Sequence, residues 1–312
     1  MTTAIPADRS QRIAAIGYDY DAQPKEAVAA CNLCGAAAFV VLAHRDRYGC
    51  AAQAHACARC GLVFLNPRMT ADAYAQFYDG VYRPLVSAFH GRQIDAKTIQ
   101  AEQRDYAIER ADFIRPFVAG HGLRSMLDIG GSTGIVSHHF AREFALEAVV
   151  IDPAPLEVDE ARRLGLETIT GLVERHDFGS RRFDVVIVCQ TVDHLLDINS
   201  VLARVRDLLD QRGILFIDIV DFRAAYLRNW SVEDAIKIDH PYYLTQDTMT
   251  AFLRRAGFDV LRVDYAADHL HVGYVCRPSP AVPGALPSSA QVEAMLQEVR
   301  LVQNASRPGS AR

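Results

Sequence analysis

Residues Leu127 to Gly134 read LDIGGSTG, and this stretch decides the fold. It ends an apolar run, Met126 to Ile129, and leads directly into a turn rich in glycine. Asp152 closes the next apolar run about twenty residues later, which is the spacing of a nucleoside-binding βαβ unit. Glycine lets the backbone approach a ligand where a β-carbon would clash, and an acid after the second strand can accept both ribose hydroxyls. The stretch predicts a site for an adenosine-containing cofactor.

The residues of this turn distinguish between cofactors. A pyrophosphate-binding loop has the pattern G-x-G-x-x-G without a negative charge beside it, whereas here Asp128 precedes the first glycine. A carboxylate repels a diphosphate and attracts an ammonium group. S-adenosylmethionine has an amino acid end and no phosphate, so the sequence favours it over a nicotinamide dinucleotide. The predicted cofactor-binding residues of this part are Asp128, Gly130, Gly131, Ser132, Gly134 and Asp152.

Strand and helix patterns alternate over residues 121–277, which is typical of an α/β fold with a mainly parallel sheet and helices on both faces. Apolar runs predict strands at 126–129, 148–151, 185–189, 214–220, 258–263 and 269–276. Helical periodicity predicts helices at 135–144, 156–164, 201–209 and 245–256. In such sheets the ligand lies beyond the carboxyl ends of the strands. Val173 and Glu174, which lie between the strands at 148–151 and 185–189, are therefore also expected to flank the adenine.

Two cysteine pairs precede the α/β region, and a glycine follows each pair. Tetrahedral zinc takes four thiolates, which two such turns about twenty residues apart can supply. Unligated buried thiols or a redox pair are the alternatives. We expect a zinc ribbon at residues 25–70 in which structural Zn²⁺ is bound by Cys31, Cys34, Cys57 and Cys60.

The remaining segments connect or extend these two parts. Residues 1–24 lack apolar periodicity and are expected to form a loose leader, and residues 71–120 show a helical pattern expected to form a linker or lid. Residues 278–312 combine a proline-rich linker with one amphipathic helix. This helix is expected to dock on its own domain or on a second subunit, in which case the protein is a homodimer.

Charge and hydropathy exclude several classes of partner. The net charge is −5 and the isoelectric point is near 6.1, so the molecule does not attract a nucleic acid by its overall field. No apolar run reaches the roughly 20 residues that span a bilayer, and the N-terminus lacks the pattern of a secretory signal. We expect a cytoplasmic protein without a membrane partner.

A second group of residues resembles known methyltransferases. Asp128-x-Gly130-x-x-x-Gly134 resembles motif I of class I S-adenosylmethionine-dependent methyltransferases. Together with the cysteine pairs, CGLVFLNPR at 60–68 and FYDGVYR at 77–83, it resembles members with an N-terminal zinc-binding domain, such as deoxysugar C-methyltransferases. The resemblance covers residues 30–277 and implies a Rossmann-like sheet of seven strands. Those sugar enzymes continue into a large C-terminal domain, whereas about 35 residues follow here, so carbon, oxygen and nitrogen acceptors all stay open.

The resemblance also implies roles around the transferred methyl group. In the segment FDVVIVCQTVDHLLD at 183–197, Cys189 and Gln190 would line the methionine end and His194 would face the transfer site. Asp239-His240-Pro-Tyr-Tyr resembles the Glu-His-x-x-Tyr segment in which a histidine is the base. The candidate catalytic residues are His240, or otherwise His194, with Asp239 and with Tyr78 or Tyr82 as a hydroxyl that steadies an enolate oxygen.

The expected function is methyl transfer from S-adenosylmethionine to a small polar metabolite. A nucleotide-linked sugar in polysaccharide or natural-product biosynthesis, methylated on carbon or oxygen, is the substrate we expect. The alternatives are an RNA methyltransferase with a zinc ribbon, a nicotinamide oxidoreductase, and a non-catalytic protein that binds S-adenosylmethionine or S-adenosylhomocysteine.

Overall fold

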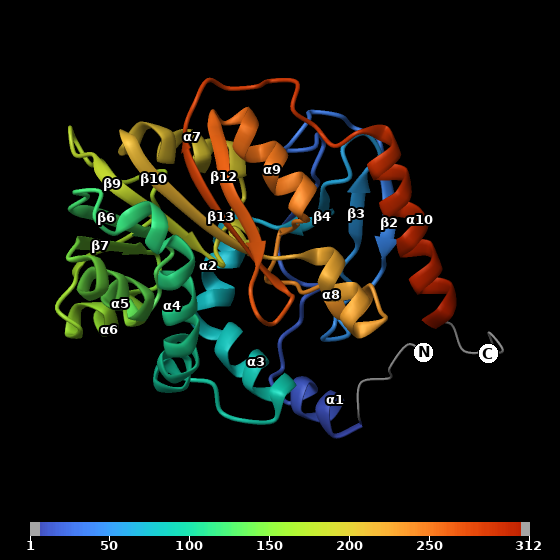
Figure 1. Cartoon of the computed structure of the whole chain (residues 1–312). Helices are drawn as coiled ribbons and strands as arrows, with labels where there is room; N and C mark the ends of the chain where they lie inside the picture. The colour runs from blue at the N-terminus through green and yellow to red at the C-terminus, as the bar shows by residue number, and fades with distance from the viewer. Residues whose placement is uncertain (1–6, 307–312) are drawn as a thin grey trace.

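A computed structural model describes residues 7–306 of the chain (Figure 1). Residues 1–6 of the expected leader and residues 307–312 of the expected tail lie outside the described residues. Figure 1 shows a large twisted sheet between helices, with a smaller sheet and the last helix, α10, side by side next to it.

The large sheet contains seven strands in the order β12-β13-β10-β9-β6-β7-β8. All neighbours are parallel except β13, which runs antiparallel to both β10 and β12. This is the expected seven-stranded, mostly parallel α/β sheet. The strands are β6 (Ser125–Ile129), β7 (Glu147–Asp152), β8 (Glu167–Thr170), β9 (Phe183–Cys189), β10 (Leu209–Val220), β12 (Phe258–Tyr265) and β13 (His271–Pro278).

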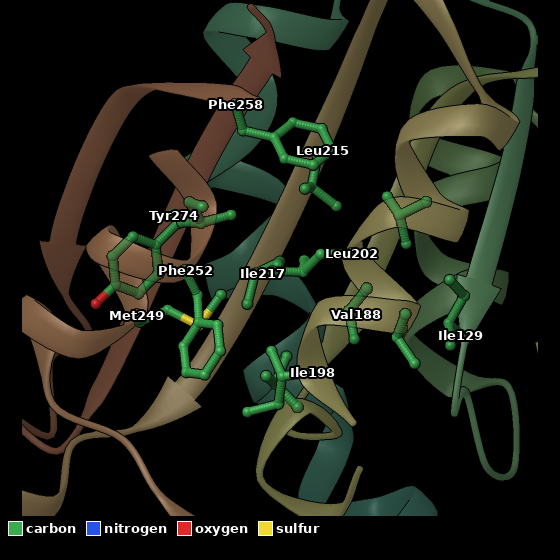
Figure 2. Close-up of a cluster of buried hydrophobic side chains, with 14 of the residues drawn as sticks. Ile129, Val188, Ile198, Leu202, Leu215, Ile217, Met249, Phe252, Phe258 and Tyr274 are labelled. Carbon is green, nitrogen blue, oxygen red and sulfur yellow. The ribbon is translucent and has the colours of Figure 1, made fainter. Parts of the chain in front are cut away.

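Helices cover both faces of this sheet. α7 (Ile198–Leu208) and α9 (Gln246–Arg255) pack on one face, and α4 (Ala96–Val118) and α5 (Ile135–Phe144) pack on the other. Figure 2 shows the first of these layers, in which apolar side chains of the strands meet those of α7 and α9. Its labelled residues are Ile129, Val188, Ile198, Leu202, Leu215, Ile217, Met249, Phe252, Phe258 and Tyr274. Because strand side chains alternate between faces, the central strands β6, β9 and β10 supply both layers.

The cysteine-rich region forms a second sheet that includes a distant segment. β2 (Phe39–Ala43), β3 (Ala54–Cys57) and β4 (Val63–Leu65) are antiparallel, and β11 (Tyr242–Tyr243) pairs with β4 at the edge. Leu65 N also donates to Pro241 O. Two further strands, β1 (Lys25–Glu26) and β5 (Arg68–Met69), pair with each other. The ribbon sheet therefore shares backbone hydrogen bonds with the part of the chain that carries His240.

The N-terminal region differs from the expected loose leader, since α1 (Ala7–Ala14) is a helix. Arg12 Nε donates to Ala88 O at 2.8 Å on α3 (Tyr82–His90), and Tyr20 is buried in the core beneath the ribbon. Tertiary contacts of this kind can order a segment without apolar periodicity. The expected helical segment after the ribbon consists of α2 (Ala71–Gly80), α3 and α4.

The C-terminal helix α10 (Ser289–Ser306) docks on its own chain. Val299 and Val302 are buried beside the ribbon sheet and α8 (Phe222–Asn229). Glu298 pairs with Arg223 at 2.6 Å and accepts a hydrogen bond from the Tyr226 hydroxyl at 2.5 Å. The first of the two expected docking modes is thus the one observed. A homodimer stays a prediction.

Candidate active site

The glycine turn lies at the carboxyl end of β6, as expected. Asp128 is buried, and its Oδ2 accepts a hydrogen bond from Ser137 Oγ at 2.5 Å, while its Oδ1 has no partner among the described residues. A β-carbon at Gly131 would lie 2.5 Å from Asp128 Oδ2, and one at Gly130 would lie 2.4 Å from Thr191. The chain's own side chains thus require these glycines. Burial raises the pKa of Asp128 to about 7, and a cationic group near Oδ1 would lower it again.

Ser132 and Asp152 connect the turn to the end of β7. The Asp152 carboxylate accepts from Ser132 N at 2.9 Å and from Ala154 N at 2.8 Å, and each oxygen keeps a second lone pair for a ribose hydroxyl. Glu157 in α6 (Pro155–Arg163) accepts from Ser132 Oγ at 3.1 Å and pairs with Arg83 at 2.6 Å. Because Arg83 belongs to α3, this helix reaches the rim of the predicted cofactor site.

The other predicted cofactor residues occupy different environments. Cys189 ends β9, and Gln190 follows it in a left-handed conformation with φ of 49°. Gly134 ends the turn before α5. Val173 is part of the buried core, whereas Glu174 is exposed after β8. The buried carboxylate with a free oxygen, the second acid and the turn between them fit S-adenosylmethionine.

The four cysteines expected to bind metal lie together. Cys31 Sγ is 3.5 Å from Cys60 Sγ, Cys34 Sγ is 3.5 Å from Cys57 Sγ, and all four sulfurs lie within 4.8 Å of one another. Zinc bound to four thiolates at about 2.3 Å places the sulfurs about 3.8 Å apart. The cluster therefore fits a tetrahedral metal ion. Cys31, Cys57 and Cys60 also belong to the core that includes α7, so the ribbon is not an independent appendage.

His240 lies between two carboxylates. Asp193 Oδ2 is 2.8 Å from its Nδ1, and Asp239 Oδ2 is 3.2 Å from its Nε2. The Lys237 ammonium lies 3.5 Å from the same Nε2, and because an ammonium only donates, it donates to Nε2. We assign the ring proton to Nδ1, where Asp193 orients it. The Nε2 lone pair then accepts from Lys237, and it can remove a proton once that hydrogen bond is given up. Asp193, which sequence reasoning passed over, directly precedes His194.

His194 packs against His240 and has another role. The two ring centroids are 4.3 Å apart. His194 Nδ1 is 2.5 Å from the Tyr78 hydroxyl and 3.2 Å from Asp239 O, and the Tyr78 hydroxyl donates to the same carbonyl at 2.7 Å. The expected Tyr78, His194 and Asp239 thus form one network, while the Tyr82 ring stacks edge-on against Tyr78 at 5.2 Å.

These contacts move the two histidine pKa values apart. Burial and the Lys237 charge act to lower the pKa of His240, but Asp193 and Asp239 outweigh them, so its pKa lies above the ordinary 6.5. Burial and the charge of His240 lower the pKa of His194 to about 4. The same histidines, opposing burial, hold the pKa values of both carboxyl groups below their usual range. His240 is therefore the stronger base.

A cavity of about 250 Å³ adjoins His240 at the carboxyl ends of β9 and β10. Its lining includes Gln190, Asp193, Lys237 and Arg47, the last from the loop between β2 and β3. Neither His194, Tyr78 nor Tyr82 is among the side chains that line it. Lys237 has a weak sequence signal, three residues before His240. Arg47 has none, because only the folded ribbon brings it here.

A comparison with known protein families identifies the domain that contains these residues. A family model described as Methyltransferase domain matches residues 78–263, which contain the glycine turn, Asp152 and both histidines. The chain belongs to this methyltransferase family. It is an S-adenosylmethionine-dependent enzyme. The match begins after the ribbon, so the cysteine cluster and Arg47 lie outside the matched domain.

Relatives of this methyltransferase include named O-methyltransferases. Ubiquinone biosynthesis O-methyltransferase of Azorhizobium caulinodans is 26% identical over 179 residues, covering 48% of this chain and 69% of the relative. The protein of the same name from Rhodopseudomonas palustris is 30% identical over 115 residues, which cover 35% of this chain and 42% of the relative. This chain thus spans less than half of that second relative.

Solved structures share the fold of the methyltransferase. Mitomycin 7-O-methyltransferase MmcR aligns with a TM-score of 0.51 at 16% identity, covering 66% of this chain and 60% of that one. The riboflavin-derivative dimethyltransferase RosA from Streptomyces davawensis has a TM-score of 0.50 at 16% identity, and the alignment covers 66% of this chain and 62% of that one.

In residues 7–306, no helix combines the length and apolar character that a membrane crossing requires.

Proposed function

We propose that this methyltransferase transfers a methyl group to a small polar acceptor, a nucleotide-linked sugar, with His240 as the general base. The observation that carries the proposal is the dyad of His240 and Asp193 at a cavity that also bears Arg47, Lys237 and the predicted cofactor residue Gln190. A histidine whose pKa is raised by two flanking carboxylates, and whose Nδ1 is held by one of them, is suited to act as a general base.

Bound S-adenosylmethionine supplies an electrophilic methyl group, so the chain has to orient the acceptor and remove one proton. His240 Nε2 takes the proton as the acceptor atom forms its bond to the methyl carbon, and the carbon–sulfur bond breaks. Asp193 and Asp239 then stabilise the imidazolium, which returns the proton to solvent. Lys237, 3.5 Å from Nε2, limits the basicity of the ring until the acceptor arrives.

His194 and Tyr78 position the base through the backbone of the residue before it, Asp239. Their hydrogen bonds to Asp239 O hold the backbone of the segment that presents His240. The Tyr78 hydroxyl is thereby engaged, and because neither Tyr78 nor Tyr82 lines the cavity, the proposal assigns neither of them a contact with the acceptor. His194 is a positioning residue in this proposal.

The cysteine cluster is proposed to bind structural Zn²⁺. Four thiolates saturate a tetrahedral ion and leave no position for substrate. The ion would hold the cysteine turns of the ribbon sheet. The edge strand of that sheet, β11, begins two residues after His240. Zinc would thus act on catalysis through the backbone next to the base.

A second candidate is O-methylation of an aromatic hydroxyl, which the matches to ubiquinone biosynthesis O-methyltransferases favour. The cavity bears Arg47, Lys237, Asp193 and His240 beside apolar side chains such as Phe222, and these charged groups suit an acceptor that carries polar groups. We therefore rank the nucleotide-linked sugar first.

Incubation with methyl-labelled S-adenosylmethionine and a panel of acceptors tests the proposal, with mass spectrometry of the products. The panel contains nucleotide-linked sugars, including 4-keto deoxysugars, and catechols. A labelled sugar would confirm the proposed class, and the position of the label would separate carbon from oxygen transfer. Label only in a catechol would replace it by the second candidate. No product, although cofactor binding is demonstrated, would reject both acceptors.

A further inference from the structure

Arg47 enters the cavity from the ribbon and is held there by its own loop. Asp46, on the same loop, accepts hydrogen bonds from Tyr48 N and Cys50 N, and its other oxygen accepts from Ile238 N at 3.0 Å. Arg47 N donates to Ile236 O at 3.0 Å. The loop is therefore attached to the segment that leads to His240, and the position of Arg47 relative to the base is defined.

The Arg47 guanidinium has aromatic neighbours but no acidic partner. Its Cζ lies 4.2 Å from the centroid of the Phe89 ring and 5.1 Å from that of Tyr48. Its Nε is buried without a hydrogen-bond partner, and no ion pair between described residues includes it. A second arginine, Arg9, lies 4.5 Å from the same Phe89 ring and also has a buried Nε without a partner. Buried donors of this kind are costly unless a ligand satisfies them.

Lys237 is a second cation in the same cavity without an ion-pair partner among the described residues. Both cations line this one cavity, and burial and the charge of Arg47 lower the pKa of Lys237 against the opposing charges of Asp239 and Asp193. Arg228 and Asp234 also line the cavity, and their charges offset one another. With His240 neutral, the lining holds three cations, Arg47, Lys237 and Arg228, against the two carboxylates of Asp193 and Asp234. The cavity therefore has an excess of positive charge beside the base.

We infer that Arg47 and Lys237 bind an anionic group of the methyl acceptor, a phosphate or a carboxylate. The inference deepens the proposed function, on which it rests, by naming the chemistry of the substrate. An anion between the two cations would satisfy the Arg47 donors and relieve the repulsion, and the guanidinium can bind either group through two hydrogen bonds. The ribbon would then contribute to substrate selection, because Arg47 belongs to the ribbon and lies outside the matched methyltransferase domain.

Titration calorimetry on the S-adenosylhomocysteine complex tests the site without requiring turnover. The probes are inorganic phosphate, diphosphate and acetate, titrated into the wild type and into Arg47→Met, Lys237→Met and Arg45→Met. Arg45 lies on the same loop but outside this cavity, so it controls for the loss of one charge. Arg47→Lys replaces Arg47→Met if the latter fails to fold, since it keeps the charge and loses the planar fork.

We expect an anion to bind the wild type and to bind about tenfold or more weakly after either cavity substitution, with Arg45→Met within about twofold. Preference for phosphate or diphosphate over acetate would identify a phosphorylated acceptor, and the reverse would identify a carboxylate. No binding of any probe at millimolar concentration, or equal losses in all three variants, would overturn the inference. The calorimetry measures anion binding and not methyl transfer. The anion site can therefore be refuted while methyl transfer to a sugar is demonstrated, and it can be confirmed while no sugar on the panel is methylated.

Discussion

His240 and His194 show how neighbouring residues of one type acquire different chemistry. Their rings are 4.3 Å apart, yet one has a raised pKa and the other a pKa of about 4. The difference arises because His240 contacts two carboxylates, whereas Nδ1 of His194 contacts a hydroxyl and a carbonyl. Of these two histidines, His240 is the one that lines the cavity.

Replacement of the base should separate chemistry from binding. His240→Ala is expected to lower kcat by about 10²- to 10⁴-fold, the usual contribution of a general base, while the affinity for S-adenosylmethionine stays within about twofold. His121→Ala, at an exposed histidine, is the control. Single-turnover methyl transfer and calorimetry measure the two quantities. Undiminished turnover in His240→Ala would remove this residue from the mechanism.

The pH dependence should report the charges around His240. The base must be unprotonated, so kcat falls as the pH drops through the pKa of His240, which Asp193 raises and Lys237 lowers. Asp193→Asn should therefore move the acidic limb to lower pH, and Lys237→Met should move it to higher pH. Both profiles are measured under single-turnover conditions. Shifts of the same sign in the two variants would contradict the assignment.

At the scale of elements, the ribbon sheet and the catalytic domain are joined by β11 and by α10. β11 pairs with β4 immediately after His240-Pro241, and α10 packs its buried valines beside the same sheet. Order in the ribbon should therefore be transmitted to the base and to the C-terminal helix, although the glycine turn lies in another part of the fold.

Loss of the metal should loosen the ribbon more than the cofactor site. Cys60→Ser is expected to lower zinc content, to reduce Tm by about 5 °C or more and to speed hydrogen exchange at 54–65 and 242–243. Affinity for S-adenosylhomocysteine should stay within about twofold. Cys50→Ser, outside the cluster, is the control. A wild-type protein without bound metal, or unchanged exchange in Cys60→Ser, would refute the structural role.

Docking of α10 can be tested with two substitutions on one helix. Val299 is fully buried, so Val299→Asp should reduce the free energy of unfolding by about 3 kcal/mol or more, because it buries an unpaired charge. Leu301 is 70% exposed, and Leu301→Asp should change it by less than about 0.5 kcal/mol. Urea denaturation measures both. Equal effects would mean that α10 does not pack as described.

At the scale of the whole molecule, charge and cavity size together argue against a nucleic acid substrate. The net charge is −5, and Arg47 and Lys237, which form no ion pair with a residue of 7–306, line a cavity of about 250 Å³. A small anion fits this arrangement, whereas an RNA helix needs an extended basic surface. Local positive charge inside a molecule of negative overall charge favours small acceptors.

We therefore expect no binding of a labelled RNA hairpin at low salt, measured by fluorescence anisotropy with a basic RNA-binding protein as positive control. The molecule lacks the net positive field that attracts phosphates over long distances. Affinity that falls steeply with added salt would instead restore the RNA methyltransferase alternative.

Local features of the sequence predicted the fold and a cofactor site. The glycine turn, Asp152 and the alternation of apolar runs predicted a mainly parallel α/β sheet, because strand and helix periodicity are short-range properties, whereas the number of seven strands came from the family resemblance. The spacing of Cys31, Cys34, Cys57 and Cys60 likewise predicted a cluster that the structure assembles. The helix α1, in the expected loose leader 1–24, could not be predicted from the local sequence, because a contact with the distant helix α3 holds it.

Tertiary structure alone decided which groups surround the base. Tyr78 and His194 are 116 residues apart in the chain, and Arg47 comes from a ribbon loop attached through Asp46 to Ile238. No spacing rule links such residues, because their proximity depends on how the ribbon sheet pairs with β11 and packs on the common core. The sequence by itself determined a methyltransferase with a cysteine cluster. The packing of its two sheets decided that His240 has Asp193 as its partner and a cationic cavity in front of it.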